Sequence, residues 1–118
     1  MSVFSERIKL AATPDGPSEE VDAVVDTGTF HSWVPRSILT GLGLRPMGRM
    51  RFAFVDGREF ERDVTEVVVR LNGSYRHTLC VMGDEGTEAL LGALTLEEFG
   101  LLVDVHNQRL IPIERFRA

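Results

Sequence analysis

Two tight-turn dipeptides, Asp56-Gly57 and Asn72-Gly73, each separate a pair of extended stretches and constrain the fold more than any other sequence feature. Such dipeptides readily adopt the positive φ angles that short hairpin turns require. The sequence therefore predicts two β-hairpins. Their arms are residues 50–55 with 58–64, and residues 65–71 with 75–82. The run of valines at 67–69 predicts a strand that is buried on both faces.

Apolar stretches divided by Gly, Pro, Asn and Asp make up most of the remaining sequence and predict a mainly β fold. Further strands are expected at residues 4–11, 21–25, 101–105 and 109–113. Only residues 94–99 have clear helical spacing, with Gly100 as the C-terminal stop, while residues 36–42 predict a short helical turn. A length of 118 residues, 43% of them hydrophobic, suits a single domain, residues 1–118. A domain this small has little material for a deep cleft, which therefore requires a partner.

Composition excludes several classes of partner. The formal net charge is −5 and the basic residues are scattered, so a nucleic-acid backbone would be repelled. The single cysteine, Cys80, has no intrachain partner and lies in an apolar stretch, which predicts a reducing compartment and an inert buried thiol. The N-terminus lacks a signal-peptide pattern, and no apolar run approaches the roughly 18 residues that span a bilayer. We therefore expect a soluble, cytoplasmic protein with no membrane partner.

Asp26, Thr27 and Gly28 carry the strongest chemical signal, because they follow directly after the apolar strand residues Val24 and Val25. A strand that ends in this tripeptide holds the loop rigidly and presents one carboxylate at its tip. The alternative is an ordinary strand-to-turn loop, since Asp, Thr and Gly all favour turns. A second motif at residues 90–92, Leu-Leu-Gly, precedes the predicted C-terminal helix and raises the odds of a functional site.

Taken together, the Asp26-Thr27-Gly28 loop, the central Asp-Gly hairpin and the Leu-Leu-Gly motif resemble the retropepsin-like aspartic proteases. The likeness extends over residues 21–113, and residues 90–112 are especially similar to the prokaryotic kind. The resemblance implies a closed, mainly β, barrel-like lobe with one short C-terminal helix. It also implies an aspartic endopeptidase that needs no cofactor and cleaves peptides or proteins as an obligate homodimer, because the chain carries only one such motif.

In such a dimer the Asp26 residues of two subunits form the catalytic pair. Two carboxylates about 3 Å apart cannot both ionise cheaply and share one proton, so one activates a water while the other donates to the scissile carbonyl. Thr27 matches the family position whose hydroxyl bonds across the two-fold axis, and Gly28 lets the substrate backbone approach closely. Thr29 can donate to the outer carboxylate oxygen, which predicts an acidic optimum.

The resemblance also implies a substrate cleft. The central hairpin corresponds to the flap that folds over a bound peptide, although a plain hairpin without a gating role is the alternative. Phe52 is expected to rest over the cleft. The expected substrate-binding residues are Thr29, Trp33, Phe54, Val55, Asp56, Gly57 and Leu90. Apolar pockets of this kind suit cleavage between bulky apolar residues.

The sequence departs from the retroviral pattern at two positions. Phe30 and Ala93 stand where retroviral members carry a carboxylate and an arginine that pair to brace the active-site base. Because both charged partners are absent, no buried charge is left unpaired. Their absence leaves open how the dimer edge is built. A second hypothesis is therefore a protease-fold dimer that binds peptides with weak or lost hydrolysis. No metal is expected, because His31, the other two histidines and Cys80 lack the spacing of a zinc site.

Overall fold

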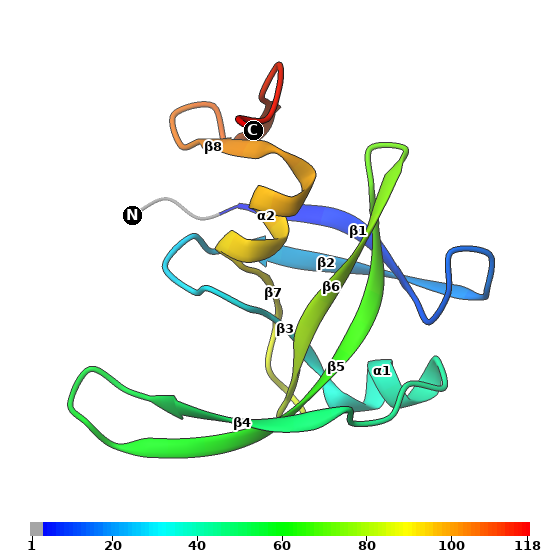
Figure 1. Cartoon of the computed structure of the whole chain (residues 1–118), viewed down its shortest axis with the longest axis vertical. Helices are drawn as coiled ribbons and strands as arrows, with labels where there is room; N and C mark the ends of the chain where they lie inside the picture. The colour runs from blue at the N-terminus through cyan, green and yellow to red at the C-terminus, as the bar shows by residue number, and fades with distance from the viewer. Residues whose placement is uncertain (1–3) are drawn as a thin grey trace.

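The computed structural model describes residues 4–118, so Met1, Ser2 and Val3 of the predicted domain lie outside the described residues. The described chain is mainly β, as the sequence predicts (Figure 1). Its strands are β1 (Ser5–Ala11), β2 (Ser18–Val25), β3 (Ser32–Pro35), β4 (Gly48–Ala53), β5 (Glu59–Leu71), β6 (Ser74–Gly83), β7 (Ala89–Leu91), β8 (Leu101–Asp104) and β9 (Arg109–Pro112). Its helices are α1 (Arg36–Gly41) and α2 (Ala93–Phe99).

The first seven strands form one sheet that closes into a barrel. Its order is β1-β2-β7-β3-β6-β5-β4, and an additional pairing of β1 with β5 closes the ring before β4. Closure removes exposed sheet edges and encloses a single apolar core. Strand β4 pairs with the first half of β5, and the resulting hairpin extends away from the barrel, whereas β8 and β9 form a separate two-stranded sheet (Figure 1). The predicted barrel-like lobe is therefore confirmed.

Strand β5 corrects the prediction of two separate strands at 58–64 and 65–71. It runs unbroken over Glu59–Leu71, because neither Val64 nor Thr65 is a turn-forming residue and both are buried. Its first half pairs with β4 and its second half with β1 and β6. One strand thus belongs to both predicted hairpins and connects the projecting hairpin to the barrel without a break.

The two predicted turns differ in form. At the β5–β6 turn Asn72 and Gly73 have φ values of 52° and 82°, as a tight two-residue hairpin requires. The β4–β5 loop is wider, because β4 ends at Ala53 and β5 begins at Glu59. Within that loop only Gly57 has a positive φ, at 89°, and its N–H donates to the Phe54 carbonyl at 2.9 Å. The predicted two-residue turn at this position was therefore too short.

The valine run in β5 lies at the centre of the core. Val67, Val68 and Val69 have 1%, 0% and 1% of their surface exposed, which confirms burial on both faces. Cys80 of β6 is also fully buried, and burial raises the pKa of its thiol to about 12. The thiol therefore stays protonated at neutral pH, as expected for a core residue.

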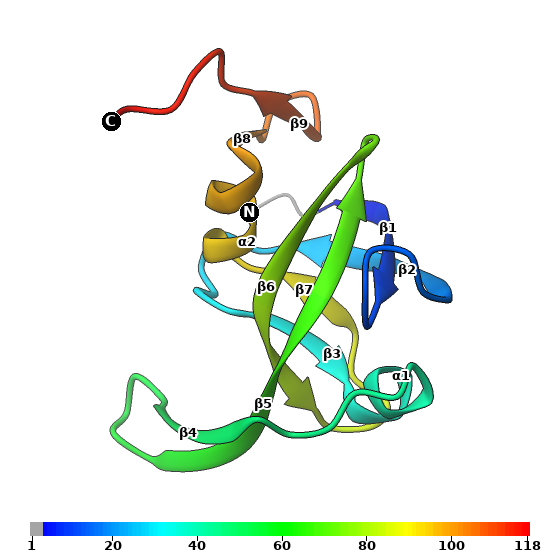
Figure 2. The same ribbon diagram turned by 45° about the vertical axis from the view of Figure 1, so that its right-hand side comes forward.

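Helix α2 lies between the barrel and the β8–β9 sheet (Figures 1 and 2). It begins after Gly92 and ends at Gly100, whose φ of 68° provides the left-handed C-terminal stop that the sequence predicts. Strand β7, which the sequence reading missed, leads directly into this helix and is only three residues long. Neither helix within residues 4–118 has the length and apolar character needed to cross a membrane.

Candidate active site

Asp26 stands at the point where β2 leaves the barrel. Strand β2 runs parallel to β7 with Val25 opposite Leu91, and the Asp26 N–H donates to the Leu91 carbonyl at 3.0 Å. This pairing brings the Asp-Thr-Gly and Leu-Leu-Gly motifs side by side. Asp26 and Leu90 are 64 residues apart in the sequence. The two motifs nevertheless form one structural unit.

Donors from the same loop hold both oxygens of the Asp26 carboxylate. The Gly28 N–H donates to Oδ1 at 3.0 Å, and the Thr29 hydroxyl donates to Oδ2 at 2.9 Å. The hydrogen bond expected from Thr29 is therefore present. Because each oxygen has its own fixed donor, the carboxylate is held in one orientation while remaining half-exposed at the surface.

The loop also packs against the start of α2. The N–H groups of Ala93 and Leu94 donate to the carbonyls of Thr29 and Phe30 at 2.8 and 2.9 Å. These are first-turn amides that have no partner within the helix, so the loop satisfies them. A Cβ on Gly92 would lie 2.7 Å from the Phe30 carbonyl oxygen, so the close approach requires glycine.

Thr27 lines a mainly apolar hollow of about 390 Å³. Besides Thr27, the hollow is lined by residues of α2 and by the β8 side of the C-terminal sheet. Leu102 and Val105 on this side have 59% and 52% of their surface exposed. Exposed apolar side chains gathered beside a polar loop mark a surface suited to contact with another protein.

A separate cleft of about 370 Å³ lies beside the same loop. Gly28, Thr29 and Trp33 line it from the barrel, and Phe54 and Val55 line it from the β4–β5 hairpin. The loop after β2 and this hairpin project on the same side of the barrel (Figure 1). The structure therefore brings most of the predicted substrate-binding residues together around one cavity.

Three predicted residues do not line that cleft. Asp56 and Gly57 lie in the hairpin turn, where Asp56 accepts hydrogen bonds from the N–H and side chain of Arg58 at 3.0 and 2.7 Å. Leu90 is half-buried in β7 and pairs with Trp33 in the sheet, so its backbone supports the cleft while its side chain is not among the lining groups. The prediction placed all three in contact with substrate.

The sequence reading left four cleft residues out of the predicted site: Phe30, His31, Ala53 and Phe60. Phe60 faces Phe52 across the hairpin, and their rings stack at 5.5 Å, while Trp33 lies 5.3 Å from Phe52. The signal was present, because residues opposite each other in an antiparallel pair share one face. Because the sequence reading placed a two-residue turn where the loop spans residues 54–58, this register was not evident.

His31 stands at the edge of the same aromatic cluster. Its ring meets those of Phe30 and Phe52 edge-on at 5.0 and 6.0 Å. Partial burial lowers the pKa of His31, because desolvation disfavours the charged imidazolium. His31 is therefore neutral at neutral pH and contributes to an apolar wall.

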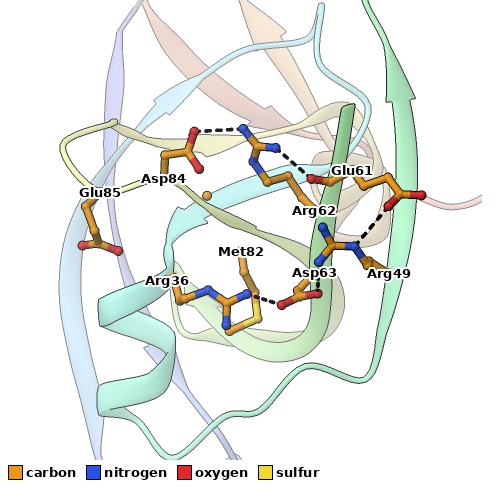
Figure 3. A pocket seen from close by; sticks show the side chains of 9 residues that line it. Arg36, Arg49, Glu61, Arg62, Asp63, Met82, Asp84 and Glu85 are labelled. Atoms are coloured by element: carbon orange, nitrogen blue, oxygen red, sulfur yellow. Dashed lines mark hydrogen bonds and ion pairs between the residues drawn. The ribbon is translucent and has the colours of Figure 1, made fainter. Parts of the chain in front are cut away.

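A second cavity, of about 460 Å³, lies at the base of the β4–β5 hairpin and is lined by charged side chains (Figure 3). Arg36 of α1 and Arg49 of β4 both bind Asp63 of β5, the latter at 2.9 Å, and Arg62 binds Asp84 at 2.9 Å. The hydrogen bond from Arg36, followed by that from Arg49, lowers the pKa of the Asp63 carboxyl. These ion pairs connect the hairpin to α1 and to the turn after β6.

The part of the chain that the structure describes contains no evident metal-binding site. Among residues 4–118 no group of three or more His, Cys, Asp or Glu side chains is placed to hold a metal ion. The residues that line the cleft beside Asp26 include neither Asp nor Glu. The described chain therefore presents one carboxylate, that of Asp26, beside this cleft.

Comparisons with solved structures identify the fold. No protein-family model matches the sequence, and no curated protein matches it. EIAV protease, complexed with the inhibitor HBY-793, is 18% identical with a TM-score of 0.62, covering 84% of this chain and 89% of that one. The retroviral protease-like domain of Ddi1 from Leishmania major is 17% identical with a TM-score of 0.57, covering 94% and 88%. A retropepsin-like aspartic protease from Rickettsia conorii is 19% identical with a TM-score of 0.53, covering 87% and 88%. The chain has the retropepsin-like fold.

Proposed function

We propose that the chain is an aspartic endopeptidase that acts as a homodimer, with Asp26 of each subunit forming the catalytic pair. One observation carries the proposal: on a retropepsin-like fold, a rigidly held Asp-Thr-Gly loop presents a single carboxylate beside an apolar cleft without a second acid. Aspartic protease chemistry needs two carboxylates. A second copy of the same loop is the simplest source of the other.

The paired carboxylates divide the work of hydrolysis. Because two carboxylates about 3 Å apart hold one proton between them, the ionised member takes a proton from a bound water, and that water attacks the scissile carbonyl. The protonated member donates a hydrogen bond to the carbonyl oxygen as charge develops there. The Gly28 amide and Thr29 hydroxyl keep each carboxylate in the plane that this division requires.

The hollow beside Thr27 supports the dimer. Thr27 is exposed in the isolated subunit, and the apolar side chains of Leu102 and Val105 stand next to it. In the proposed dimer the Thr27 hydroxyls bond across the two-fold axis, and the apolar surfaces of α2 and β8 cover one another. This arrangement buries exposed apolar area and places the two Asp26 loops together in one step.

The aromatic cleft supports a peptide substrate with bulky apolar side chains. Trp33, Phe52 and Phe60 form a continuous apolar wall, and Phe54 and Val55 at the hairpin loop are more than half exposed. We propose that this hairpin is a flap that closes on bound peptide and covers the exposed side chains. Closure excludes water from the cleft and lets the hairpin backbone bond to the peptide.

The direct test is cleavage of a random peptide library between roughly pH 3 and 7 by wild type and by Asp26→Asn. The wild type is expected to cleave, and the variant to lose at least about a thousandfold in kcat/KM while keeping its circular dichroism spectrum. If wild type and variant both leave the library intact, the endopeptidase proposal fails. A peptide-binding dimer then becomes the better hypothesis.

A mixing experiment tests whether both Asp26 residues are needed. When equal amounts of wild type and Asp26→Asn exchange subunits at random, about a quarter of the dimers retain two Asp26 residues. Activity per wild-type subunit should then fall to about half. Unchanged activity after exchange would mean that one Asp26 is sufficient, which contradicts the shared-pair mechanism. Sedimentation checks that wild type and variant both form dimers.

A further inference from the structure

Four side chains behind the Asp26 loop form a continuous chain of hydrogen bonds. The Gly92 N–H donates to Ser32 Oγ at 3.0 Å, Ser32 Oγ meets Thr95 Oγ1 at 2.6 Å, and Thr95 Oγ1 meets Thr78 Oγ1 at 3.0 Å. Thr78 Oγ1 then donates to Glu98 Oε1 at 2.6 Å. Ser32, Thr78 and Thr95 have 3%, 1% and 0% of their surface exposed, and they are three of the four buried polar residues among residues 4–118.

The proton positions along this chain are fixed by its end. A carboxylate accepts only, so the single proton of Thr78 goes to Glu98. Thr95 must therefore donate to Thr78, and Ser32 must donate to Thr95, because each hydroxyl has one proton. The Gly92 N–H supplies the last donor at the other end. All four bonds thus run in one direction, from Gly92 to Glu98, and polarise one another where Ser32, Thr78 and Thr95 are buried.

This chain of hydrogen bonds connects α2 to the loop that carries Asp26. Thr95 and Glu98 are three residues apart and lie on the same face of α2, so their bonds fix the rotation of the helix against β3 and β6. The first-turn amides of the same helix hold the carbonyls of Thr29 and Phe30. A rotation or shift of α2 would therefore displace the loop whose Thr29 hydroxyl orients the carboxylate.

We propose that Ser32, Thr78, Thr95 and Glu98 are positioning residues for Asp26, which they hold in register through Gly92 and α2. The inference rests on the proposed function for its catalytic consequence, but its structural part does not depend on activity. Loss of these hydrogen bonds moves the two Asp26 carboxylates out of their shared plane. Small misplacements of reacting groups lower the rate of the chemical step.

Thr95 is the residue at which to cut the chain. Thr95→Val keeps the shape of the side chain but removes the hydroxyl, which leaves Ser32 without an acceptor and Thr78 without a donor. Thr95→Ser keeps the hydroxyl and loses only a methyl group, so it should restore the chain. The matched control is Thr65→Val, because Thr65 is also buried and its hydroxyl donates only to the Arg45 carbonyl, at 2.8 Å, away from the loop.

The first readout is the rate of amide hydrogen exchange at Gly92, Ala93 and Leu94, measured in the wild type and in each variant. Thr95→Val is expected to speed exchange at these amides by about tenfold, and Thr95→Ser by less than about twofold. Thr65→Val should leave the exchange rates of these three amides unchanged. Equal effects of Thr95→Val and Thr65→Val on Gly92, Ala93 and Leu94 would overturn the proposal.

The second readout is kinetic. For Thr95→Val we expect kcat to fall by about tenfold with KM within about twofold of wild type, because the loop geometry affects chemistry more than peptide binding. A kcat equal to that of Thr65→Val would overturn the positioning role. If the wild type itself does not cleave peptides, the proposed function fails, and the exchange rates still decide whether the chain holds α2 and the loop.

Two variants of Glu98 test whether its carboxylate ends the hydrogen-bond chain. Glu98→Gln keeps an acceptor oxygen for Thr78, whereas Glu98→Leu removes it. Amide exchange at Gly92 should therefore stay near the wild-type rate in Glu98→Gln and rise by about fivefold in Glu98→Leu. The same Gly92 exchange rate in both variants would show that Glu98 does not end the chain, which contradicts the proposal.

Discussion

Gly92→Ala is the substitution whose effect follows most directly from the structure. A Cβ at this position would lie 2.4 Å from the carbonyl oxygen of His31 and 2.7 Å from that of Phe30, whereas ordinary contact begins at 3.4 Å. The obstacle is backbone, so the loop and α2 must separate by about 1 Å. The φ of Gly92 is −88°, which any residue adopts, so the penalty is steric. We expect the free energy of unfolding to fall by about 2–3 kcal/mol.

Thermal and urea unfolding of Gly92→Ala measure this penalty, with Gly41→Ala as the control. For a domain of this size each kcal/mol lowers Tm by roughly 4 °C, which predicts a loss of about 8–12 °C. Gly41 lies in α1 and has no atom within 4 Å of an added Cβ, so alanine there should leave stability unchanged or raise it by up to about 1 kcal/mol. Equal stability of the two variants would refute the argument that Gly92 is needed for close packing.

Two further predictions concern the dimer surface and pH. Leu102→Arg places a charge in the apolar hollow beside Thr27 and should weaken dimerisation by at least about tenfold. The control is Met47→Arg, at an exposed apolar residue outside that hollow, which should leave dimerisation unchanged. Sedimentation equilibrium measures both dissociation constants, and equal values would exclude this surface from the dimer interface. Burial lowers the pKa of His31, so the unfolded chain binds the proton first, and stability should fall as pH drops below about 6.5. Urea unfolding at pH 7 and pH 5 should show a smaller loss in His31→Phe, and identical losses would contradict the role of His31.

The sequence predicted the elements whose signals are local. Alternating apolar residues, turn dipeptides and the Gly100 stop each act within a few positions, so most strands and the C-terminal helix were found near their true bounds. Strand β7 escaped prediction because three residues carry no periodicity, and its conformation depends on pairing with β2 and β3. The continuity of β5 was also missed, since its two halves pair with different strands.

The candidate site divides in the same way. Asp26, Thr27 and Gly28 were predicted because their chemistry is contained in one tripeptide that follows a strand. The aromatic wall was predicted only in part, because the pairing of Phe52 with Phe60 depends on the width of the hairpin turn. The hydroxyl chain was not predicted, since Ser32, Thr78 and Thr95 come from three elements and are common residue types. Only the fold shows that these hydroxyls meet.

The apolar substitutions at Phe30 and Ala93 now have a structural explanation. Where retroviral members carry a carboxylate and an arginine, Phe30 and Ala93 contribute to the contact between the loop and α2 through their backbone groups. The Ala93 N–H binds the Thr29 carbonyl, and the Leu94 N–H binds the Phe30 carbonyl. Backbone bonds of this kind need no buried charge, so they avoid the desolvation penalty of an ion pair. They hold the loop only where α2 is itself held, and the chain from Gly92 to Glu98 provides that restraint.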